Sequence, residues 1–490
     1  DESKILNARA ETMANKSMII SEIRQMIDYA NDSELSAYAE IKQFRDNKKE
    51  SGLSEEDFNS KLIELVGKLD GAIESNVQKQ INLGSSAQVC DLFYNKLGIP
   101  FSGDKQSVAK KEVKALLKEK NDDGTPKYPV VHLYSKYKNE ETLLSKFFDN
   151  LIYFTYPGGF IFSSFGQIAT NTGRMSCSKP NCQQYPKVIT KIIIPRDGYV
   201  MMDADYSQIE YRVLTAMAGN EWLAELFSNP DSDYHTLMAS LMYDVDYSAV
   251  TSSMRSAAKS FNFGIPYGMG LGSLAILLTG KNTAQTRDEA AEKMEDYFKN
   301  QPKTRKFFDN VKEMAQVNGY TKTLFNRYRY YTFTDKDGNV NNAKKAAALR
   351  QAGNAVIQGT AADIFKIGVA RNFSFIRRNN LLGKLLIINM VHDEQLMEVD
   401  VQHLNMQRIV AEVGNNMQFK VDGFPPLYIG AGIGKAWGYA KGKMAEIHPN
   451  LLEEFTEEAR NIPIWRTEEE IKEKPYVDPQ EVLNYFDSRV

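Results

Sequence analysis

Two acidic residues, Asp205 and Asp393, lie far apart in the sequence, and each stands beside an apolar, strand-like run. The run Leu385–Val391 leads into Asp393 and Gln395–Val399 follows it, so this aspartate is predicted at the tip of a hairpin. Residues 216–380, between the two acidic segments, have mainly helical spacing. We therefore predict an α+β fold in which a sheet is interrupted by a long helical insertion.

If the fold brings Asp205 and Asp393 together, the two carboxylates form a binding site for hard divalent cations. An ionised carboxylate is costly to bury alone, so a converging pair requires a metal, a base or a shared proton. All three explanations are compatible with the residues themselves.

Bulk properties are those of a soluble globular protein, with 42% hydrophobic and 25% charged residues. At 490 residues the chain exceeds the size of a single core, so several subdomains are expected. No membrane span or signal peptide is recognisable, and three cysteines suit a reducing, cytoplasmic compartment. Cys177 and Cys182 resemble half of a zinc site, but no second Cys or His pair lies nearby.

The formal net charge is −3, but the charge is unevenly distributed. From Glu446 to the C-terminus there are 12 acidic and 5 basic residues, so the preceding part of the chain is net positive. A groove that binds a polyanion is therefore allowed. The acidic segment itself is expected to be either a solvated appendage or a helix pair that binds a protein partner.

The N-terminal 80 residues have the spacing of antiparallel helices with polar connections. The residue pattern changes from helical spacing to short apolar runs from Phe160 onward, and Phe160–Phe165 and Val188–Ile194 are predicted as strands.

Arg255, Lys259, Phe263 and Tyr267 recur every four residues and so form one stripe of a predicted helix. Two cations followed by two aromatic rings are able to hold a triphosphate at one end and to stack on a base at the other. The simpler interpretation is an amphipathic helix whose cations are solvated and whose rings enter the core.

Together these segments resemble motifs A, B and C of the family A DNA polymerases, the group of bacterial DNA polymerase I and related phage replicases. Asp205–Glu210 resembles motif A, Arg255–Gly268 resembles motif B, and Val391–Glu394 resembles motif C. Further blocks agree in order, among them Thr172–Ser176, Asp233–Thr236 and Gln358–Asp363. The resemblance covers roughly residues 80–437.

The resemblance implies a right-hand polymerase fold and template-directed DNA synthesis with two Mg²⁺ ions, for which Mn²⁺ is able to substitute. Its catalytic residues are expected to be Asp205, Asp393 and Lys259, with the metal ions held by Asp205, Asp393 and the backbone carbonyl of Tyr206. Glu394 is a provisional addition to this site.

The resemblance also implies binding residues for each substrate, and dNTPs and primer-template DNA are the expected partners of a monomer. The nucleotide-binding residues are Gln208, Glu210, His235, Arg255, Lys259, Phe263 and Tyr267. Glu210 is expected to select deoxynucleotides by filling the space beside C2′. The readers of the DNA duplex are Arg174, Gln183, Gln184, Arg350, Asn354, Gln358 and His392.

Three residues depart from the family pattern: Gln184, Asn326 and Pro266, the last of which would end or kink the motif B helix. The expected domains are a thumb-like helical region (1–158), a first palm part (159–215), fingers (216–342), a second palm part (343–445) and the acidic extension (446–490). The proofreading domain of polymerase I is expected to be missing, because the chain opens within thumb-like helices.

Two rival functions stay open. A single-subunit RNA polymerase has the same kind of palm domain with metal-binding carboxylates, although Glu210 and the Phe263-Gly264 pair argue against this function. A catalytically silent DNA-binding protein with this fold would bind duplex without incorporating nucleotides.

Overall fold

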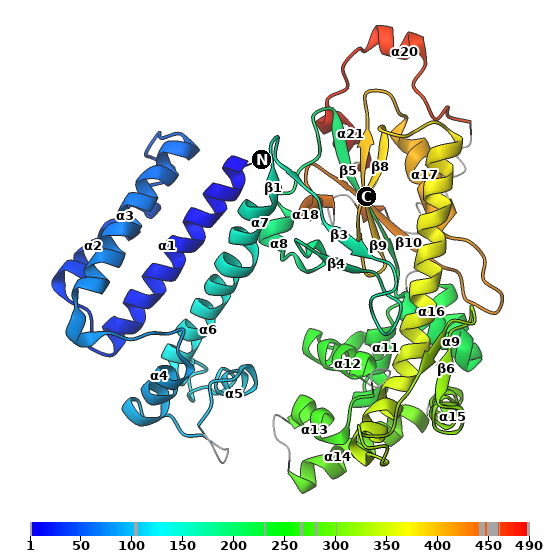
Figure 1. Cartoon of the computed structure of the whole chain (residues 1–490), viewed down its shortest axis with the longest axis horizontal. Helices are drawn as coiled ribbons and strands as arrows, with labels where there is room; N and C mark the ends of the chain where they lie inside the picture. The colour runs from blue at the N-terminus through cyan, green and yellow to red at the C-terminus, as the bar shows by residue number, and fades with distance from the viewer. Residues whose placement is uncertain are drawn as a thin grey trace. The chain divides into compact units, whose positions relative to one another are not determined.

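The computed structural model describes residues 2–101, 106–229, 232–264, 268–279, 283–299, 301–440, 446–447, 459 and 461–487. The chain divides into two compact units, Asp1–Phe162 and Ser163–Val490 (Figure 1). The sequence placed its first boundary between residues 158 and 159, and the finer division of the second unit remains a prediction. Among the described residues, no helix combines the length and the apolar character needed to cross a membrane.

The first unit is built mainly from helices, as its sequence spacing predicts. α1 (Glu2–Met26) packs against α3 (Glu55–Ser75) and α6 (Pro129–Thr142), and α2 (Asp32–Asp46) packs against α3. The side chains of Asn31 and Ser54 cap the starts of α2 and α3. The remaining elements are α4 (Ser86–Cys90), α5 (Lys110–Leu116), α7 (Asp149–Phe154), π-helical segments Asp91–Lys96 and Leu143–Phe148, and strands β1 (Thr155–Tyr156) and β2 (Phe160–Ile161).

The second unit is organised around a five-stranded antiparallel sheet in the order β11-β10-β5-β9-β8. Its strands are β5 (Tyr199–Tyr206), β8 (Leu385–Val391), β9 (Glu394–Asp400), β10 (Ile429–Gly434) and β11 (Glu446–Ile447). The predicted hairpin around Asp393 is confirmed, because β8 and β9 are antiparallel neighbours joined by His392 and Asp393.

Alternation along β5 separates the core from the acidic residues. Met202, Ala204 and Tyr206 belong to the main core, which includes residues of the long helix α16 (Asn342–Arg378) and of α17 (Met406–Met417). Met201 belongs to a separate cluster with Leu396 and Trp437. Because successive side chains of a strand point to opposite faces, Asp205 lies on the same face as Met201. The main core thus fixes β5 without burying Asp205.

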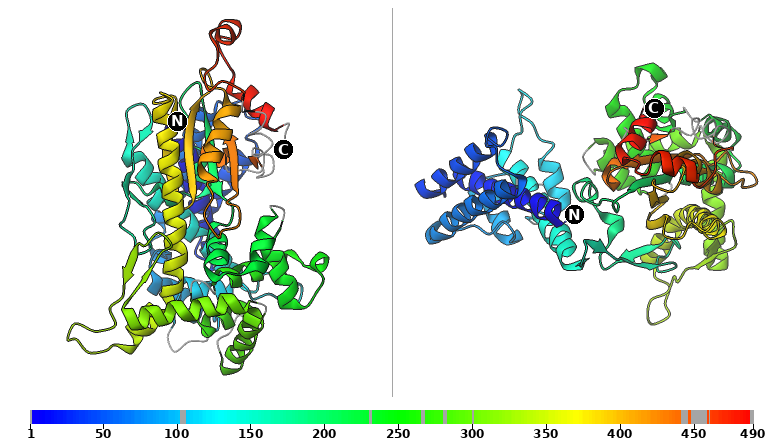
Figure 2. Two further views of the ribbon diagram at one scale, coloured as in Figure 1. Left: turned by 90° about the vertical axis from the view of Figure 1, so that its right-hand side faces the viewer. Right: turned by 90° about the horizontal axis from the view of Figure 1, so that it is seen from above.

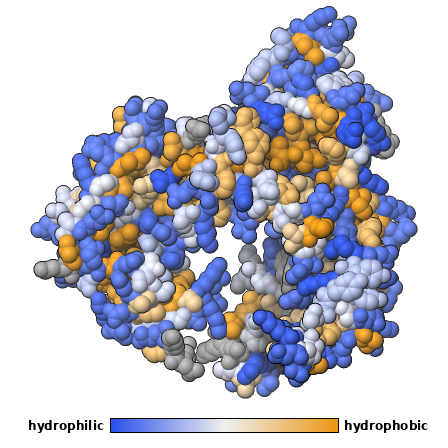
Figure 3. All heavy atoms as spheres, in the orientation of Figure 1, coloured by the Kyte–Doolittle hydropathy of each residue, from blue (hydrophilic) through white to orange (hydrophobic). Residues whose placement is uncertain are grey.

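Helices fill most of the interval between β5 and β8, as predicted (Figure 2). In the view of Figure 3, apolar residues gather over the region of the sheet. The helices are α9 (Ile209–Ala218), α10 (Glu221–Ser228), α11 (Tyr234–Tyr243), α12 (Ser252–Gly264), α13 (Leu271–Thr279), α14 (Ala284–Lys299) and α15 (Pro302–Asn318), and a small hairpin of β6 (Tyr320–Lys322) and β7 (Tyr328–Tyr330) follows them.

One predicted strand is wrong. The apolar run Val188–Ile194 does not join a sheet; it begins with the short helix α8 (Lys187–Thr190) and continues as a turn. Ile189 and Thr190 are buried, which accounts for the apolar sequence, since a short apolar run is typical of a buried helix as well as of a strand. The run Phe160–Phe165 is divided between β2 and β3 (Ser164–Gly166), and β3 pairs with β4 (Ser176–Ser178).

Part of the acidic extension, around Val477 and Leu483, packs onto the second unit and is not a solvated appendage, whereas Glu468–Glu473 has no buried residue. The side chain of Gln402 accepts a hydrogen bond from the backbone N–H of Val477 (2.9 Å) and donates one to its carbonyl (2.7 Å). Leu483 of α21 (Pro479–Asp487) is buried in the main core. The preceding helix is α20 (Glu468–Glu473), and α18 (Trp437–Ala440) follows β10.

Candidate functional site

The sheet brings the two predicted metal ligands to neighbouring positions. Asp205 at the end of β5 lies directly opposite Glu394, the residue after Asp393. The backbone N–H of Tyr206 donates a hydrogen bond to the carbonyl of Asp393 (3.3 Å). Asp205 is exposed and Asp393 is half-buried. We call this group, Asp205, Asp393 and Glu394, the acid edge.

The acid edge concentrates negative charge. The pKa of Asp393 is raised to about 6, mainly by burial; the charges of Glu210 and Glu394 also raise it, whereas a backbone hydrogen bond and Arg174 act in the opposite direction. A cation at this position would relieve both the desolvation and the repulsion. The chemistry of the site therefore fits a divalent cation.

The small number of protein ligands at the acid edge also suits a magnesium ion. Within the part of the chain that the structure describes, no group of three or more His, Cys, Asp or Glu side chains is arranged to hold a metal. Mg²⁺ is usually bound by one or two carboxylates, and waters and substrate phosphates complete its octahedron. Asp205, Asp393 and the carbonyl of Tyr206 are the residues that would hold it.

Glu394 has a partner that the sequence did not reveal. Its carboxylate Oε1 accepts a hydrogen bond from the indole Nε1–H of Trp437 (2.9 Å), and both residues are buried. The ring of Trp437 lies 6.2 Å from that of Tyr185, and its backbone N–H donates to the carbonyl of Ile193. The buried indole thus fixes a carboxylate of the acid edge.

The turn after β5 brings together two residues that were predicted to have separate roles. Gln208 has a left-handed backbone (φ 52°) at the start of α9, so Glu210 occupies the first helical turn. Glu210 forms an ion pair with Arg174. The predicted sugar selector and the predicted duplex reader therefore contact each other.

Helices α11 and α12 hold the predicted triphosphate-binding cations. Arg255 Nε donates to Asp233 Oδ2 (2.5 Å), and Asp233 Oδ1 also caps α11 by accepting hydrogen bonds from the N–H groups of His235 and Thr236. Partial burial would raise the pKa of Asp233, but Arg255 and Thr236 outweigh it and hold this pKa at about 2. Lys259 is exposed one helical turn after Arg255.

His235 is enclosed between the same two helices. It is 6% exposed, and its Nδ1 lies 3.2 Å from Nδ2 of Asn262 on α12. The pKa of His235 is lowered to about 4, mainly by burial; Asp233 opposes this shift, while Arg255 and Lys259 act in the same direction as burial. The imidazole is therefore neutral at pH 7, and the structure does not present it as a surface cation. The side chain of Phe263 and all of Tyr267 lie outside the described residues.

Three of the predicted duplex readers lie near the motif C turn or in a neighbouring segment. His392 has a left-handed backbone (φ 59°) and an exposed side chain. Gln183 donates its side-chain amide to the carbonyl of Met390 (2.7 Å), so it is tied to the end of β8. Gln184 is exposed in the adjacent 3-10 turn.

Besides Arg174, three predicted readers remain, and Arg350, Asn354 and Gln358 follow one another on α16. Arg350 is exposed, Asn354 is half-buried and Gln358 is only 6% exposed. Gly268 approaches this helix closely, because a Cβ placed on it would lie 2.4 Å from the carbonyl oxygen of Arg350. Exposure on this face of α16 therefore decreases from Arg350 through Asn354 to Gln358.

Sequence reasoning gave no role to four residues that organise this region: Asp233, Asn262, Trp437 and Arg212. Arg212 is buried and donates hydrogen bonds to the carbonyls of Ser207 (2.9 Å), Phe227 (2.7 Å) and Pro426 (2.6 Å). Burial lowers the pKa of Arg212 to about 10. Only Asp233 had a readable signal, as a capping residue before a helix.

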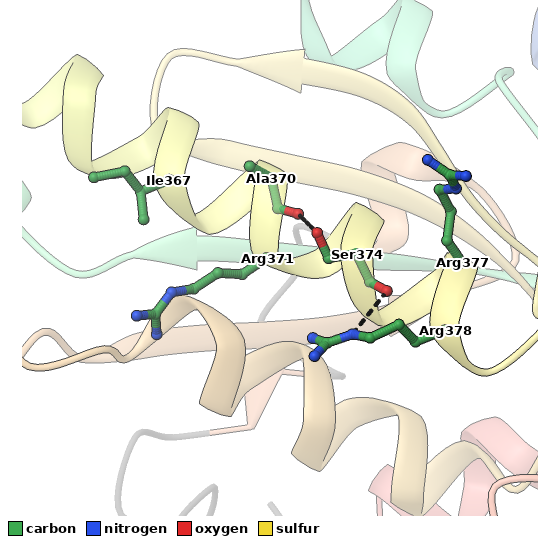
Figure 4. Close-up of a pocket in the computed structure, with 6 residues that line it drawn as sticks. All are labelled: Ile367, Ala370, Arg371, Ser374, Arg377 and Arg378. Atoms are coloured by element: carbon green, nitrogen blue, oxygen red, sulfur yellow. Dashed lines mark hydrogen bonds between the residues drawn. The ribbon is translucent and has the colours of Figure 1, made fainter.

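An open pocket of about 670 Å³ lies away from these residues, on the C-terminal half of α16 (Figure 4). It is lined by Ile367, Ala370, Arg371, Ser374, Arg377 and Arg378. Arg378 donates to the carbonyl of Ser374 (3.3 Å), and the guanidinium of Arg371 lies over the ring of Phe419. None of the predicted site residues lines this pocket.

Comparison with known proteins supports the resemblance. The model of DNA polymerase family A matches residues 54–439. DNA polymerase I of Caldicellulosiruptor bescii is 33% identical over 380 residues, which are 76% of this chain and 42% of that protein. The thermostable DNA polymerase I of Thermus aquaticus is 32% identical over 391 residues, which are 78% of this chain and 44% of that protein. The chain thus spans less than half the length of these relatives.

A solved structure agrees in fold. The polymerase domain of Pol1 from M. smegmatis, in complex with a DNA primer-template and a dNTP, matches with a TM-score of 0.66 and 26% identity. The match covers 87% of this chain and 70% of the other. The predicted α+β, right-hand polymerase fold is thereby confirmed.

Proposed function

Because the chain belongs to DNA polymerase family A, we propose that it is a DNA-directed DNA polymerase. In this reaction the 3′-hydroxyl oxygen of a primer forms a bond to the α-phosphorus of a dNTP. The bond from that phosphorus to the β-phosphate oxygen breaks, pyrophosphate leaves, and the hydroxyl proton passes to solvent. The three free cysteines are consistent with the reducing cytoplasm, which we propose as the location.

The observation that carries the proposal is the acid edge. The β5–β9 register sets Asp205 opposite Glu394, beside Asp393, on the open end of a buried sheet. Two Mg²⁺ or Mn²⁺ ions bound there would stabilise the attacking and leaving oxygens of the displacement. The residues that would hold them are Asp205, Asp393 and the carbonyl of Tyr206.

The helical side of the site supplies the positive charge that a triphosphate requires. Arg255 and Lys259 are exposed on one face of α12 and would contact the phosphates of the incoming nucleotide. Glu210 would restrict the space beside C2′, and its pairing with Arg174 orients it. Arg350 at the exposed end of the α16 face would contact the duplex.

Primer extension with purified protein tests this function. Asp205→Asn and Asp393→Asn remove one charge each without changing side-chain volume, and we expect each to lower the rate by at least ~10²-fold, the scale seen when a key electrostatic group is removed. Asp337→Asn, at an exposed loop position, is the matched control and keeps its rate. Full activity in either site variant would overturn the metal assignment.

Competition between dNTPs and rNTPs separates this proposal from the RNA polymerase alternative. We expect incorporation of dNTPs over rNTPs, and we expect Glu210→Ala to narrow that preference, since it opens the space beside C2′. Duplex binding without incorporation, in the presence of Mg²⁺, would instead support a catalytically silent DNA-binding protein.

A further inference from the structure

The β6–β7 hairpin presents an exposed row of tyrosines that the proposed function leaves without a role. In its register Tyr320 lies opposite Tyr330, and Lys322 lies opposite Tyr328. Residues directly opposite each other share one face of an antiparallel pair, and positions two apart along a strand share it too. These four side chains therefore form a single face, which we call the tyrosine face.

The rings of the tyrosine face lie close together. The ring centroids of Tyr328 and Tyr330 are 6.2 Å apart and nearly parallel, at 17°, and Tyr320 is 5.1 Å from Tyr328 and 5.9 Å from Tyr330. Nevertheless the side chains stay open, because Tyr328 is 48% and Tyr330 75% exposed. Large aromatic surface is thus left accessible at a defined position.

The opposite face of the hairpin is fixed to the second unit. Thr321 is 1% exposed, and Arg329 Nη2 donates to Oε1 of Gln351 on α16 (2.9 Å). The connecting turn is also held, since the N–H of Leu324 donates to the hydroxyl of Thr360 (3.1 Å). Strand β6 packs against α15 and α16 (Figure 2). The tyrosine face therefore belongs to a supported element beside the helix that carries Arg350.

Cross-strand aromatic contacts stabilise a hairpin, and this would explain part of the arrangement. It does not explain why Tyr330, the most exposed of the three rings, is aromatic. The two strands contain Lys322 and Arg329 and no acidic residue. Open π-faces next to a cation suit a ligand with flat rings and negative charge, which is the chemistry of unpaired nucleotides.

We propose that the tyrosine face is a stacking platform for unpaired bases of single-stranded DNA. Tyr328 and Tyr330 would stack on bases, and Lys322 would attract the phosphate backbone. Binding of this kind depends on neither base sequence nor nucleotide incorporation. In a polymerase the matching strand is the unpaired template ahead of the duplex, and only this identification of the strand rests on the proposed function.

Fluorescence anisotropy with a labelled oligo-dT tests the binding itself. In Tyr328→Leu/Tyr330→Leu the apolar cross-strand packing is retained but the π-faces are lost, and we expect affinity to fall about tenfold or more. Tyr328→Phe/Tyr330→Phe keeps the rings and should keep the affinity. Tyr476→Leu removes a ring that is 63% exposed elsewhere and is the matched control.

Two further readouts separate stacking from charge. The slope of log Kd against log salt should be the same in the Leu double variant as in the parent, whereas Lys322→Gln should reduce it. An oligonucleotide of abasic residues should bind the parent as weakly as the Leu double variant binds oligo-dT.

Primer-template DNA identifies the strand. The Leu double variant should lose affinity for a primer-template with a 5′ template overhang but not for a blunt duplex. Equal oligo-dT affinity of the Leu double variant and the parent would overturn the proposal, and equal binding of abasic and oligo-dT strands by the parent would do the same. If oligo-dT binding behaves as expected while no dNTP is incorporated, the proposed polymerase function fails and the platform stands.

Discussion

The acid edge and the α11–α12 pair differ in what holds their charged groups. At the acid edge, backbone register between buried strands sets the positions of Asp205 and Asp393, and the buried indole of Trp437 supports Glu394. In the α11–α12 pair, contacts between side chains set the positions: Arg255 is hydrogen-bonded to Asp233, and His235 contacts Asn262. The carboxylates are thus placed by the sheet itself, whereas the cations depend on contacts that a single substitution removes.

The largest expected effect on stability lies in the α11–α12 pair and concerns pH. The pKa of His235 is lowered to about 4 in the folded protein, below its ordinary value of 6.5, so the unfolded chain binds the extra proton between these values. Stability is therefore highest above pH 6.5 and falls as the pH drops toward 4. Between pH 7.5 and pH 5 this one group should cost about 2 kcal/mol of unfolding free energy.

Urea unfolding of the parent and of His235→Gln at both pH values measures this cost. The chain has three tryptophans, Trp222, Trp437 and Trp465, all in the second unit, so their fluorescence follows the unit that contains His235. The Gln variant should lose about 2 kcal/mol less than the parent between pH 7.5 and pH 5. No such difference should arise between pH 7.5 and pH 9. Equal losses at pH 5 would contradict the burial of a neutral imidazole.

The next effect tests the support of the acid edge. Trp437→Phe keeps the ring beside Tyr185 but removes the N–H that Glu394 accepts. Glu394 lies beside the proposed ligand Asp393, and losing a hydrogen bond in the surroundings of a metal site typically costs 10–100-fold in metal affinity or activity, so we expect about tenfold here. The concentration of Mg²⁺ that gives half-maximal primer extension should rise, and Mn²⁺ binding followed by electron paramagnetic resonance should weaken in parallel.

Trp222→Phe is the control for this substitution, because Trp222 is 40% exposed on α10 and does not contact the acid edge. It should leave both the Mg²⁺ dependence and Mn²⁺ binding unchanged. If Trp437→Phe behaves like this control, the indole is only a packing residue.

The sequence predicted the sheet half of the site well, for a physical reason. An apolar run followed by a carboxylate and a second apolar run encodes β8, the turn at Asp393 and β9 locally, without information from other parts of the chain. The same reasoning failed at Val188–Ile194, where a buried helical turn requires the same apolar residues as a buried strand.

The contacts of the helical half could not be predicted from the sequence. Arg174 and Glu210, Arg255 and Asp233, and His235 and Asn262 are each separated by more than 20 residues, beyond the reach of any helical or strand period. Their pairing follows from how helices and loops pack, and a single sequence carries no pattern for it. The hydrogen bond between Trp437 and Glu394 was equally invisible.

The smallest expected effect separates the two functions of Asp233, capping and charge pairing. Asp233→Ala removes both the acceptor at the start of α11, usually worth about 1 kcal/mol of unfolding free energy, and the charge that pairs with Arg255. Asp233→Asn keeps a good cap and loses only the charge that pairs with Arg255. Because that pair is partly exposed (44% for Arg255), its loss should cost only about 0.5 kcal/mol, and less in high salt.

The two Asp233 variants and the parent are compared by tryptophan-monitored urea unfolding at pH 7, with and without added NaCl. A concentration of ~0.5 M NaCl is enough to screen exposed ion pairs. Burial opposes the ionised form of Asp233, but Arg255 and Thr236 hold its pKa at about 2, so at pH 7 the carboxylate is charged and its stabilisation is fully present. If Asn costs as much as Ala, the cap adds no measurable stability and the ion pair with Arg255 accounts for the whole effect. In that case the α11–α12 pair would be held mainly by charge, and its contrast with the register-built acid edge would be sharper.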